Sequence, residues 1–279
     1  MDVAPISSVR PMKARWHSVS STREYETCPR RYRFGYVERR PKDRPVPPHW
    51  RFGTVVHAGL EAAWKGAMAD PDAPLADHLP AALAAAAASV EAEGLGPDDG
   101  ARAARVLTAA LAADVVRDRD HGVDDGPAAA VPPRPIGVEE ALRGWAGGDH
   151  DRVIGFADLV LEHADGTVEL VDHKVTSKRL GPDELRDDFQ LNLYGHLASK
   201  RWRDAPRIVA TIHYPTGPEA VSVELGAEGM RAADRRVRAA ARAIAADGEF
   251  PAVPSEACTN CPWQPSCPEG TAWDGVGAA

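Results

Sequence analysis

Apolar positions recur at a helical period in the first 120 residues and at a strand period in much of the rest of the chain. Ser21 and Glu24 have the spacing of a capping box, which predicts a helix that begins at Ser21 and carries Cys, Tyr and several Arg. The segment Phe52–Lys65 has helical spacing and ends at Gly66, after a stiff Pro-rich linker over 41–48. Two Ala-rich helices are expected near 75–93 and 100–120, followed by a Gly/Pro-rich loop over 121–135.

The second half of the chain predicts an α/β fold. Its segments follow in this order: strands at 136–142, 153–162 and 167–174, a helix at 183–202, strands at 208–214 and 220–225, and a helix at about 227–247. Helix, three strands, helix and strand predict an α/β sandwich around a mixed sheet. We expect one integrated domain with these parts: a basic helical segment at 1–50, a core at 51–250 with the helical insertion at about 70–130, and a Cys-bearing tail at 251–279 that packs against the N-terminus.

Two acidic residues and a lysine occupy facing positions of the predicted hairpin. The residues Ala-Asp-Gly at 164–166 suit a three-residue turn with a left-handed Gly166, which would set Asp158 opposite Asp172. Lys174 follows Asp172 by two residues and therefore shares its face of the strand. Facing carboxylates repel each other unless a cation lies between them, so the pattern favours a Mg²⁺ or Mn²⁺ site. Divalent ions held beside an ammonium group are suited to phosphodiester hydrolysis.

An exposed hairpin whose Asp and Lys side chains form surface ion pairs is the alternative interpretation. The flanking positions are apolar, namely Phe156, Leu159, Val160 and Leu161 on one strand and Val168, Leu170 and Val171 on the other. Such runs predict a sheet that is covered on both faces, where charges without compensation are costly. That environment favours the metal site.

The motif from Gly155 to Asp158, followed by V-D-H-K-V-T around Asp172 and Lys174, resembles the core of the PD-(D/E)XK nuclease superfamily. Within it, the RecB-like exonuclease branch is the most similar. The resemblance implies a restriction-endonuclease-like αβββαβ core, with Asp158 and Asp172 as metal ligands and Lys174 as the catalytic lysine. It also implies that the carbonyl of His173 can add a ligand. Because side chains alternate along a strand, the His173 side chain is expected to point away from Asp172 and Lys174.

Other positions match the same branch. The resemblance implies that His57, in F-G-x-x-x-H, is a metal ligand. It places Gln190 and Tyr194, which share a helical face at i and i+4, near the metal and the DNA backbone. Glu139 matches an acidic position close to the site, although the sequence does not separate it from the adjacent Glu140.

The four cysteines lie near the two ends of the chain, at Cys28 and at Cys258, Cys261 and Cys267. C-x-x-C spacing is typical of zinc and of iron–sulfur sites, and three of these cysteines precede proline, as in ferredoxin-type sites. The one-plus-three arrangement resembles the iron–sulfur subset of RecB-like nucleases, including AddB-type and CRISPR-adaptation relatives, which implies a 4Fe–4S cluster. Structural Zn²⁺ is the alternative. Either group would join the N- and C-terminal segments.

The net charge of −8 is unevenly distributed. Residues 1–60 contain 12 Lys and Arg against 5 Asp and Glu, whereas the rest of the chain contains 21 against 36. This asymmetry predicts a basic surface on an acidic body, with a solvated Arg-rich face as the alternative. Arginines between aromatic rings suit a groove for single strands, and the candidates are Arg23, Arg30, Arg31, Arg33, Tyr25 and Tyr36.

These features predict a two-metal DNA exonuclease of the RecB-like, iron–sulfur type, acting on single-stranded DNA or DNA ends in repair or recombination. No G-x-x-x-x-G-K-[ST] motif occurs, so ATP-driven unwinding would need a separate helicase partner. The alternatives are a non-catalytic iron–sulfur DNA-binding subunit of a helicase–nuclease complex, a CRISPR-adaptation-type nuclease, and an RNA or nucleotide hydrolase. The sequence shows neither a membrane span nor a secretory signal, so we expect a cytoplasmic, nucleoid-associated protein.

Overall fold

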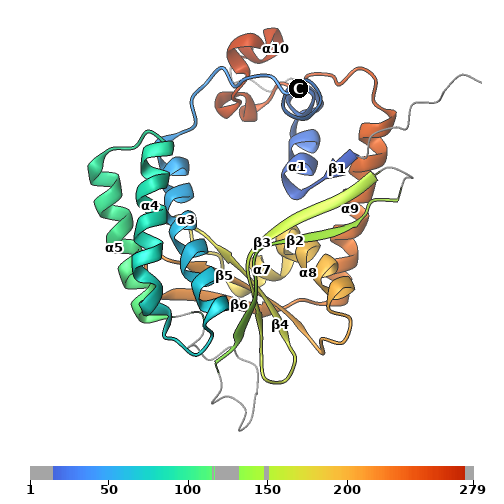
Figure 1. The fold of residues 1–279 in the computed structure, drawn as a ribbon. Helices are drawn as coiled ribbons and strands as arrows, with labels where there is room; N and C mark the ends of the chain where they lie inside the picture. Colours follow the sequence, from blue (N-terminus) through green and yellow to red (C-terminus); the bar gives the residue numbers. More distant parts are fainter. Residues whose placement is uncertain (1–14, 115, 117–131, 148–150, 274–279) are drawn as a thin grey trace, which may run out of the picture.

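The computed structural model describes residues 15–114, 116, 132–147 and 151–273, which form a mixed six-stranded sheet flanked by helices (Figure 1). The strands are β1 (Arg15–His17), β2 (Arg134–Trp145), β3 (Asp151–Glu162), β4 (Val168–His173), β5 (Ile208–Tyr214) and β6 (Glu219–Glu224). Their order is β1-β3-β4-β5-β6, and β2 pairs with β3 outside this path. The pairs β1–β3 and β4–β5 are parallel and the others are antiparallel, as a mixed sheet requires.

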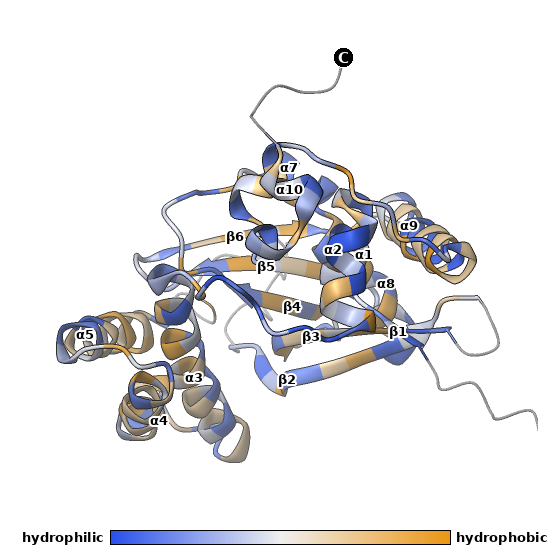
Figure 2. Ribbon diagram, turned by 90° about the horizontal axis from the view of Figure 1, so that it is seen from above, coloured by the Kyte–Doolittle hydropathy of each residue, from blue (hydrophilic) through white to orange (hydrophobic). Residues whose placement is uncertain are grey.

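The helices are α1 (Val19–Thr27), α2 (Pro29–Tyr32), α3 (Pro48–Ala69), α4 (Leu79–Ala92), α5 (Pro97–Ala113), α7 (Pro182–Asp187), α8 (Phe189–Arg201), α9 (Ala227–Ala246) and α10 (Pro268–Thr271). A π-helical turn covers Arg33–Val37, and 3₁₀ turns cover Leu75–His78, Glu256–Asn260 and Gln264–Ser266. In Figure 2, α3–α5 lie at one side of the sheet and α8 and α9 at the other.

Two apolar cores separate these layers. The sheet and the α8–α9 layer enclose one core, in which Val153, Leu193 and Val237 are buried. The Ala-rich helices and α3 enclose the second core against the other face of the sheet, with Leu60, Leu107 and Leu159 fully buried. The apolar runs on both sides of the hairpin therefore fill cores on both faces, as the sequence predicts.

Several predicted element boundaries were wrong. Helix α1 begins at Val19 because Ser18 is its N-cap: Ser18 Oγ accepts a hydrogen bond from Ser21 N (3.1 Å), and Ser21 Oγ accepts one from Ser18 N (2.8 Å). Helix α3 begins at Pro48, which suits the first helical position, and runs through Gly66 instead of ending there. A side chain at Gly66 would collide with His78, so this glycine permits a close helix contact.

Three further differences concern other elements. The predicted helix over 183–202 is two helices, because Asp188 has extended backbone and caps α8 through a hydrogen bond from Leu191 N (2.9 Å). Strand β1 was not predicted, and β2 begins at Arg134, inside the expected loop. The rest of that loop up to residue 131 and the end of the second Ala-rich helix beyond residue 116 lie outside the described residues.

The tail lies beside the N-terminal helices although more than 200 residues separate them in sequence (Figure 1). Arg30 N donates to Pro251 O (3.2 Å), and Asp43 N donates to Pro262 O (3.1 Å). The ring of Trp263 is buried against Phe34, with centroids 6.3 Å apart. These contacts fasten the two ends of the chain to each other above the sheet.

Candidate metal centre and cysteine pocket

The β3–β4 hairpin brings two carboxylates together in the register that the turn residues predict. Leu159 pairs with Val171, and Gly166 has a left-handed φ of 85° in the turn. Asp158 lies one residue beyond the last pair, and its Oδ2 accepts a hydrogen bond from His173 N (2.7 Å). Burial and the neighbouring Asp172 carboxylate raise the pKa of Asp158 from 3.8 to about 8. The hairpin thus concentrates negative charge in a partly buried place.

Helix α3 contributes a histidine to the same place. His57 Nδ1 lies 3.5 Å from Asp158 Oδ2, and His57 Nε2 lies 2.8 Å from the carbonyl oxygen of His173. One ligand atom from each of His57, Glu139 and Asp158 lies within 4.8 Å of the others. An imidazole and two carboxylates at this spacing can hold a divalent ion.

The structure separates Glu139 from Glu140. Glu139 falls between the pairs Val138–Leu159 and Glu140–Ala157, so it lies opposite Asp158. Its φ of 49° is a left-handed conformation that a side-chain-bearing residue adopts at a cost of about 1–3 kcal/mol. Glu140 instead forms an ion pair with Arg201 (2.9 Å). The residue with the left-handed backbone, Glu139, is therefore the one whose carboxylate lies near His57 and Asp158.

Asp172 is held by a separate set of contacts. Lys174 Nζ lies 2.8 Å from Asp172 Oδ2, and Gln190 Nε2 donates to Asp172 Oδ1 (2.6 Å). Burial alone would lower the pKa of Lys174, but Asp172, and more weakly Asp158, raise it overall. The lysine therefore keeps its positive charge beside the carboxylates, and Asp172 lies outside the compact group of His57, Glu139 and Asp158.

A strand glycine explains the position of Tyr194. A Cβ at Gly155 would collide with the Tyr194 ring, so only glycine lets the ring lie against β3. Burial raises the pKa of Tyr194 to about 12, which keeps its hydroxyl protonated at neutral pH. Gly155 lies three residues before Asp158 on β3, so the Tyr194 ring of α8 packs on the strand close to the carboxylate site.

The side chain of His173 points away from the carboxylates. Its Nδ1 lies 2.9 Å from His213 Nδ1, and both rings are buried in the sheet. Burial holds the pKa of His173 well below its usual value, so its ring is neutral. Only the backbone of His173 faces the site, through N–H to Asp158 and through its carbonyl oxygen to His57.

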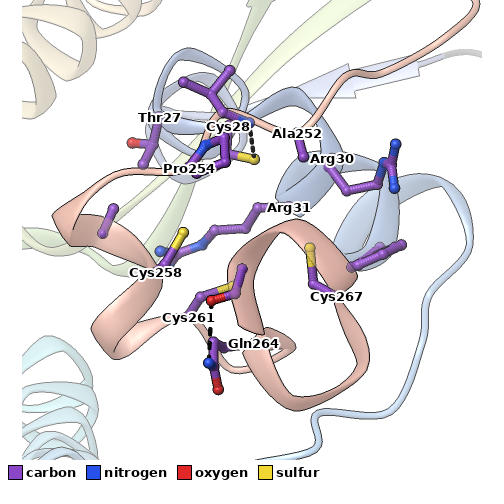
Figure 3. Close-up of a pocket in the computed structure, with 14 residues that line it drawn as sticks. Thr27, Cys28, Arg30, Arg31, Ala252, Pro254, Cys258, Cys261, Gln264 and Cys267 are labelled. Atoms are coloured by element: carbon purple, nitrogen blue, oxygen red, sulfur yellow. Dashed lines mark hydrogen bonds between the residues drawn. The ribbon is translucent and has the colours of Figure 1, made fainter. Parts of the chain in front are cut away.

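All four cysteines line one cavity between the N-terminal helices and the tail (Figure 3). The pocket has about 430 Å³ of space between its lining atoms, part of it open to solvent, and the four thiols are free of disulfides. Cys28 Sγ accepts a hydrogen bond from Val253 N (3.4 Å), and burial raises the pKa of Cys261 and of Cys267. In the part of the chain that the structure describes, no three cysteine sulfurs lie within 4.8 Å of one another.

The predicted DNA-contacting residues make many contacts within the protein. The contacts are Arg23 to Asp188 (3.4 Å), Arg30 to Phe250 O (3.0 Å), Arg31 to Glu24 (2.7 Å), Arg33 to Glu38 (2.6 Å) and Tyr25 to Asp247 (2.9 Å). Tyr36 stacks on Tyr32, with centroids 5.1 Å apart, and remains 41% exposed. These arginines thus have partners that a nucleic acid would have to replace or share.

The fold and the carboxylate–lysine site define the class of protein. A family model described as the PD-(D/E)XK nuclease superfamily matches residues 17–268, and the chain belongs to this superfamily, whose members are generally metal-dependent nucleases that act on DNA. A solved structure described as "Crystal structure of SSO0001" is similar, with 14% identity, a TM-score of 0.36, and coverage of 94% of this chain and 89% of that one. No curated protein matches the chain. Among the described residues, no helix is long and apolar enough to cross a membrane.

Proposed function

We propose that this protein is a divalent-metal-dependent DNA exonuclease of the RecB-like branch that acts on single-stranded DNA or DNA ends in repair or recombination. The observation that carries the proposal is the meeting of Asp158, Asp172 and Lys174 at the open end of one hairpin, with His57 from α3 beside them. Divalent ions held by anionic ligands beside a retained ammonium group are suited to phosphodiester hydrolysis.

The residues fit a divalent ion. Burial and the neighbouring Asp172 carboxylate raise the pKa of Asp158 to about 8, and a divalent cation bound there would favour the ionised carboxylate. His57, Asp158, Asp172 and the carbonyl of His173 are the proposed ligands of Mg²⁺ or Mn²⁺, and Glu139 is positioned to join them. Bound ions of this kind supply Lewis-acid activation of the phosphate and a more acidic water.

The remaining residues act on charge and orientation. The Lys174 ammonium, held by Asp172, would orient the attacking water and offset charge that develops on the phosphate. Gln190 fixes the Asp172 carboxylate, so that it keeps one orientation toward Lys174. Tyr194 is kept protonated and can donate a hydrogen bond toward the DNA backbone.

We further propose that the cysteine pocket holds a 4Fe–4S cluster. In a tetrahedral zinc site the Zn–S distance of about 2.3 Å places sulfurs roughly 4 Å apart, whereas the cysteine sulfurs of the described residues do not form such a compact group. A wider ring of thiols around a cavity suits a larger group. The cluster would join Cys28 to the tail and so close a very long loop of the chain.

The test uses end-labelled single-stranded, end-labelled duplex and circular DNA with Mg²⁺ or Mn²⁺. The proposal predicts stepwise loss of label from linear DNA and no cleavage of circles. Asp172→Asn should abolish cleavage with the fold retained, whereas Asp183→Asn, whose side chain is 99% exposed, should cleave as the wild type does. Tight binding of DNA without any cleavage would contradict the proposal and support a non-catalytic subunit of a helicase–nuclease complex. Cleavage of circles would indicate an endonuclease.

A further inference from the structure

The β2–β3 pair extends beyond the rest of the sheet towards β1 (Figure 1). Along the first half of β3, Asp151, Val153, Gly155 and Ala157 are buried, while the alternate residues remain accessible to solvent. The accessible positions and their β2 partners are Arg152 with Trp145, Ile154 with Arg143, and Phe156 with Ala141. Side chains of paired residues share a face, so these six form one continuous surface.

Large rings are exposed on this surface. Trp145 is 45% exposed and Phe156 is 49% exposed. Trp16 of β1, which pairs with Arg152 from the other edge of β3, adds a third ring that is 46% exposed. The guanidinium carbon of Arg152 lies 3.7 Å from the centroid of the Trp145 ring. Exposed apolar rings gathered on one face are typical of an interaction site, because removing apolar surface from water is favourable.

The surface leads directly to the candidate metal centre. Asp158 follows Phe156 by two residues along β3, and Glu139 lies opposite Asp158 on β2. Asp158 lies six positions after Arg152, which is about 20 Å at the rise of an extended strand. A ligand lying along this strip would therefore meet the carboxylates at one end.

The charge of the strip is positive. Arg143 and Arg152 lie on it, and no acidic residue occurs among its members before Glu139 and Asp158. Arg143 is exposed and forms no ion pair with any residue that the structure describes. Exposed rings together with guanidinium groups are the combination that holds unpaired nucleotides, since bases stack on the rings and phosphates contact the arginines.

We propose that this aromatic–basic strip, formed by Trp16, Arg143, Trp145, Arg152 and Phe156, binds the single strand of DNA whose phosphate enters the metal centre. The inference rests on the proposed nuclease function and names the substrate form. A duplex would not suit the strip, because paired bases cannot open their faces to the indole and phenyl rings. The strand would lie along β3, with its reacting phosphodiester at Asp158.

Binding is measured separately from cleavage. Fluorescence anisotropy with a labelled 20-nucleotide single strand, in EDTA, gives Kd for the wild type and for Trp16→Ala, Trp145→Ala and Phe156→Ala. Loss of one stacked base should weaken binding between about 5-fold and about 140-fold in each variant. Trp145→Phe, which keeps a ring, should retain most of the affinity. Thermal melting confirms that each variant folds.

Two matched controls locate the binding. Trp50→Ala removes an indole that is 62% exposed elsewhere and should bind as the wild type does. Arg143→Ala should reduce the slope of log Kd against log salt by about 0.7, as loss of one phosphate contact on a single strand does, whereas Arg105→Ala on α5 should leave it unchanged. Strip variants that fold and bind with wild-type affinity, or a loss confined to Trp50→Ala, would overturn the inference.

The two proposals fail in different ways. If the wild type binds single strands through the strip but cleaves no DNA with Mg²⁺ or Mn²⁺, the nuclease function is refuted and the strand-binding surface stands. If the wild type cleaves and the strip variants cleave and bind equally well, the strip is refuted and the nuclease function stands. Preference of the wild type for duplex over single strand by a factor of ten or more would also overturn the strip.

Discussion

Replacement of Asp158 by Asn should stabilise the metal-free protein at neutral pH, although it removes a proposed metal ligand. Burial and the Asp172 carboxylate raise the pKa of Asp158 from 3.8 to about 8. Between these two values the folded state keeps a proton that the unfolded state has released. Stability therefore falls as the pH rises through this window, by about 1.36 kcal/mol for each pH unit.

The effect is large enough to measure. From pH 5 to pH 7, two units inside the window, the wild type should lose about 3 kcal/mol of unfolding free energy relative to Asp158→Asn. The amide oxygen of Asn can still accept the hydrogen bond that Asp158 takes from His173 N, so the local structure is preserved.

Urea denaturation in EDTA at pH 5, 6 and 7 provides the assay. Asp183→Asn is the matched control, because it removes a carboxylate that is 99% exposed, and its pH dependence should follow that of the wild type. An equal pH dependence for the wild type and Asp158→Asn would refute the electrostatic reasoning. Added Mn²⁺ should stabilise the wild type at pH 7 more than it stabilises Asp158→Asn.

Three further changes test other parts of the site. Lys174→Met should reduce DNA cleavage at least 100-fold in a single-turnover assay, since it removes the ammonium beside the phosphate, and unchanged cleavage would exclude that role. Gly155→Ala should cost about 1–3 kcal/mol of unfolding free energy because the new methyl group meets the Tyr194 ring, and Tyr194→Ala in the same chain should recover part of the loss. Cys28→Ser should abolish absorbance near 400 nm in anaerobically purified protein and lower its Tm; a colourless wild type that contains zinc would contradict the iron–sulfur assignment.

Local chemistry was sufficient to predict the hairpin. The register around Asp158 and Asp172 follows from one turn, in which Gly166 adopts the left-handed conformation that glycine favours, so a short stretch of sequence determines it. The buried strands on either side were predicted for a similar reason, because their apolar runs are continuous. The amino-acid sequence alone was therefore enough to place the central strands and their two carboxylates.

Features that depend on distant contacts were not predictable. Strand β1 has three residues, too few for a periodic signal, and it exists because it pairs with β3 about 135 residues away. The left-handed backbone of Glu139 has no sequence signature, so Glu139 and Glu140 could be separated only in the structure. The basic N-terminal helices likewise find partners such as Phe250 O from the far end of the chain.

The proposed function depends above all on a divalent ion that the hairpin carboxylates hold beside Lys174. Crystals grown with Mn²⁺ and measured at its absorption edge test this directly, because the anomalous signal locates manganese without reference to activity. We expect a peak within about 2.5 Å of oxygen atoms of both Asp158 and Asp172, with His57 as a further ligand. The contradicting result, in saturating Mn²⁺, is the absence of a peak between Asp158 and Asp172. The two carboxylates would then keep only their contacts with Lys174, Gln190 and the His173 amide.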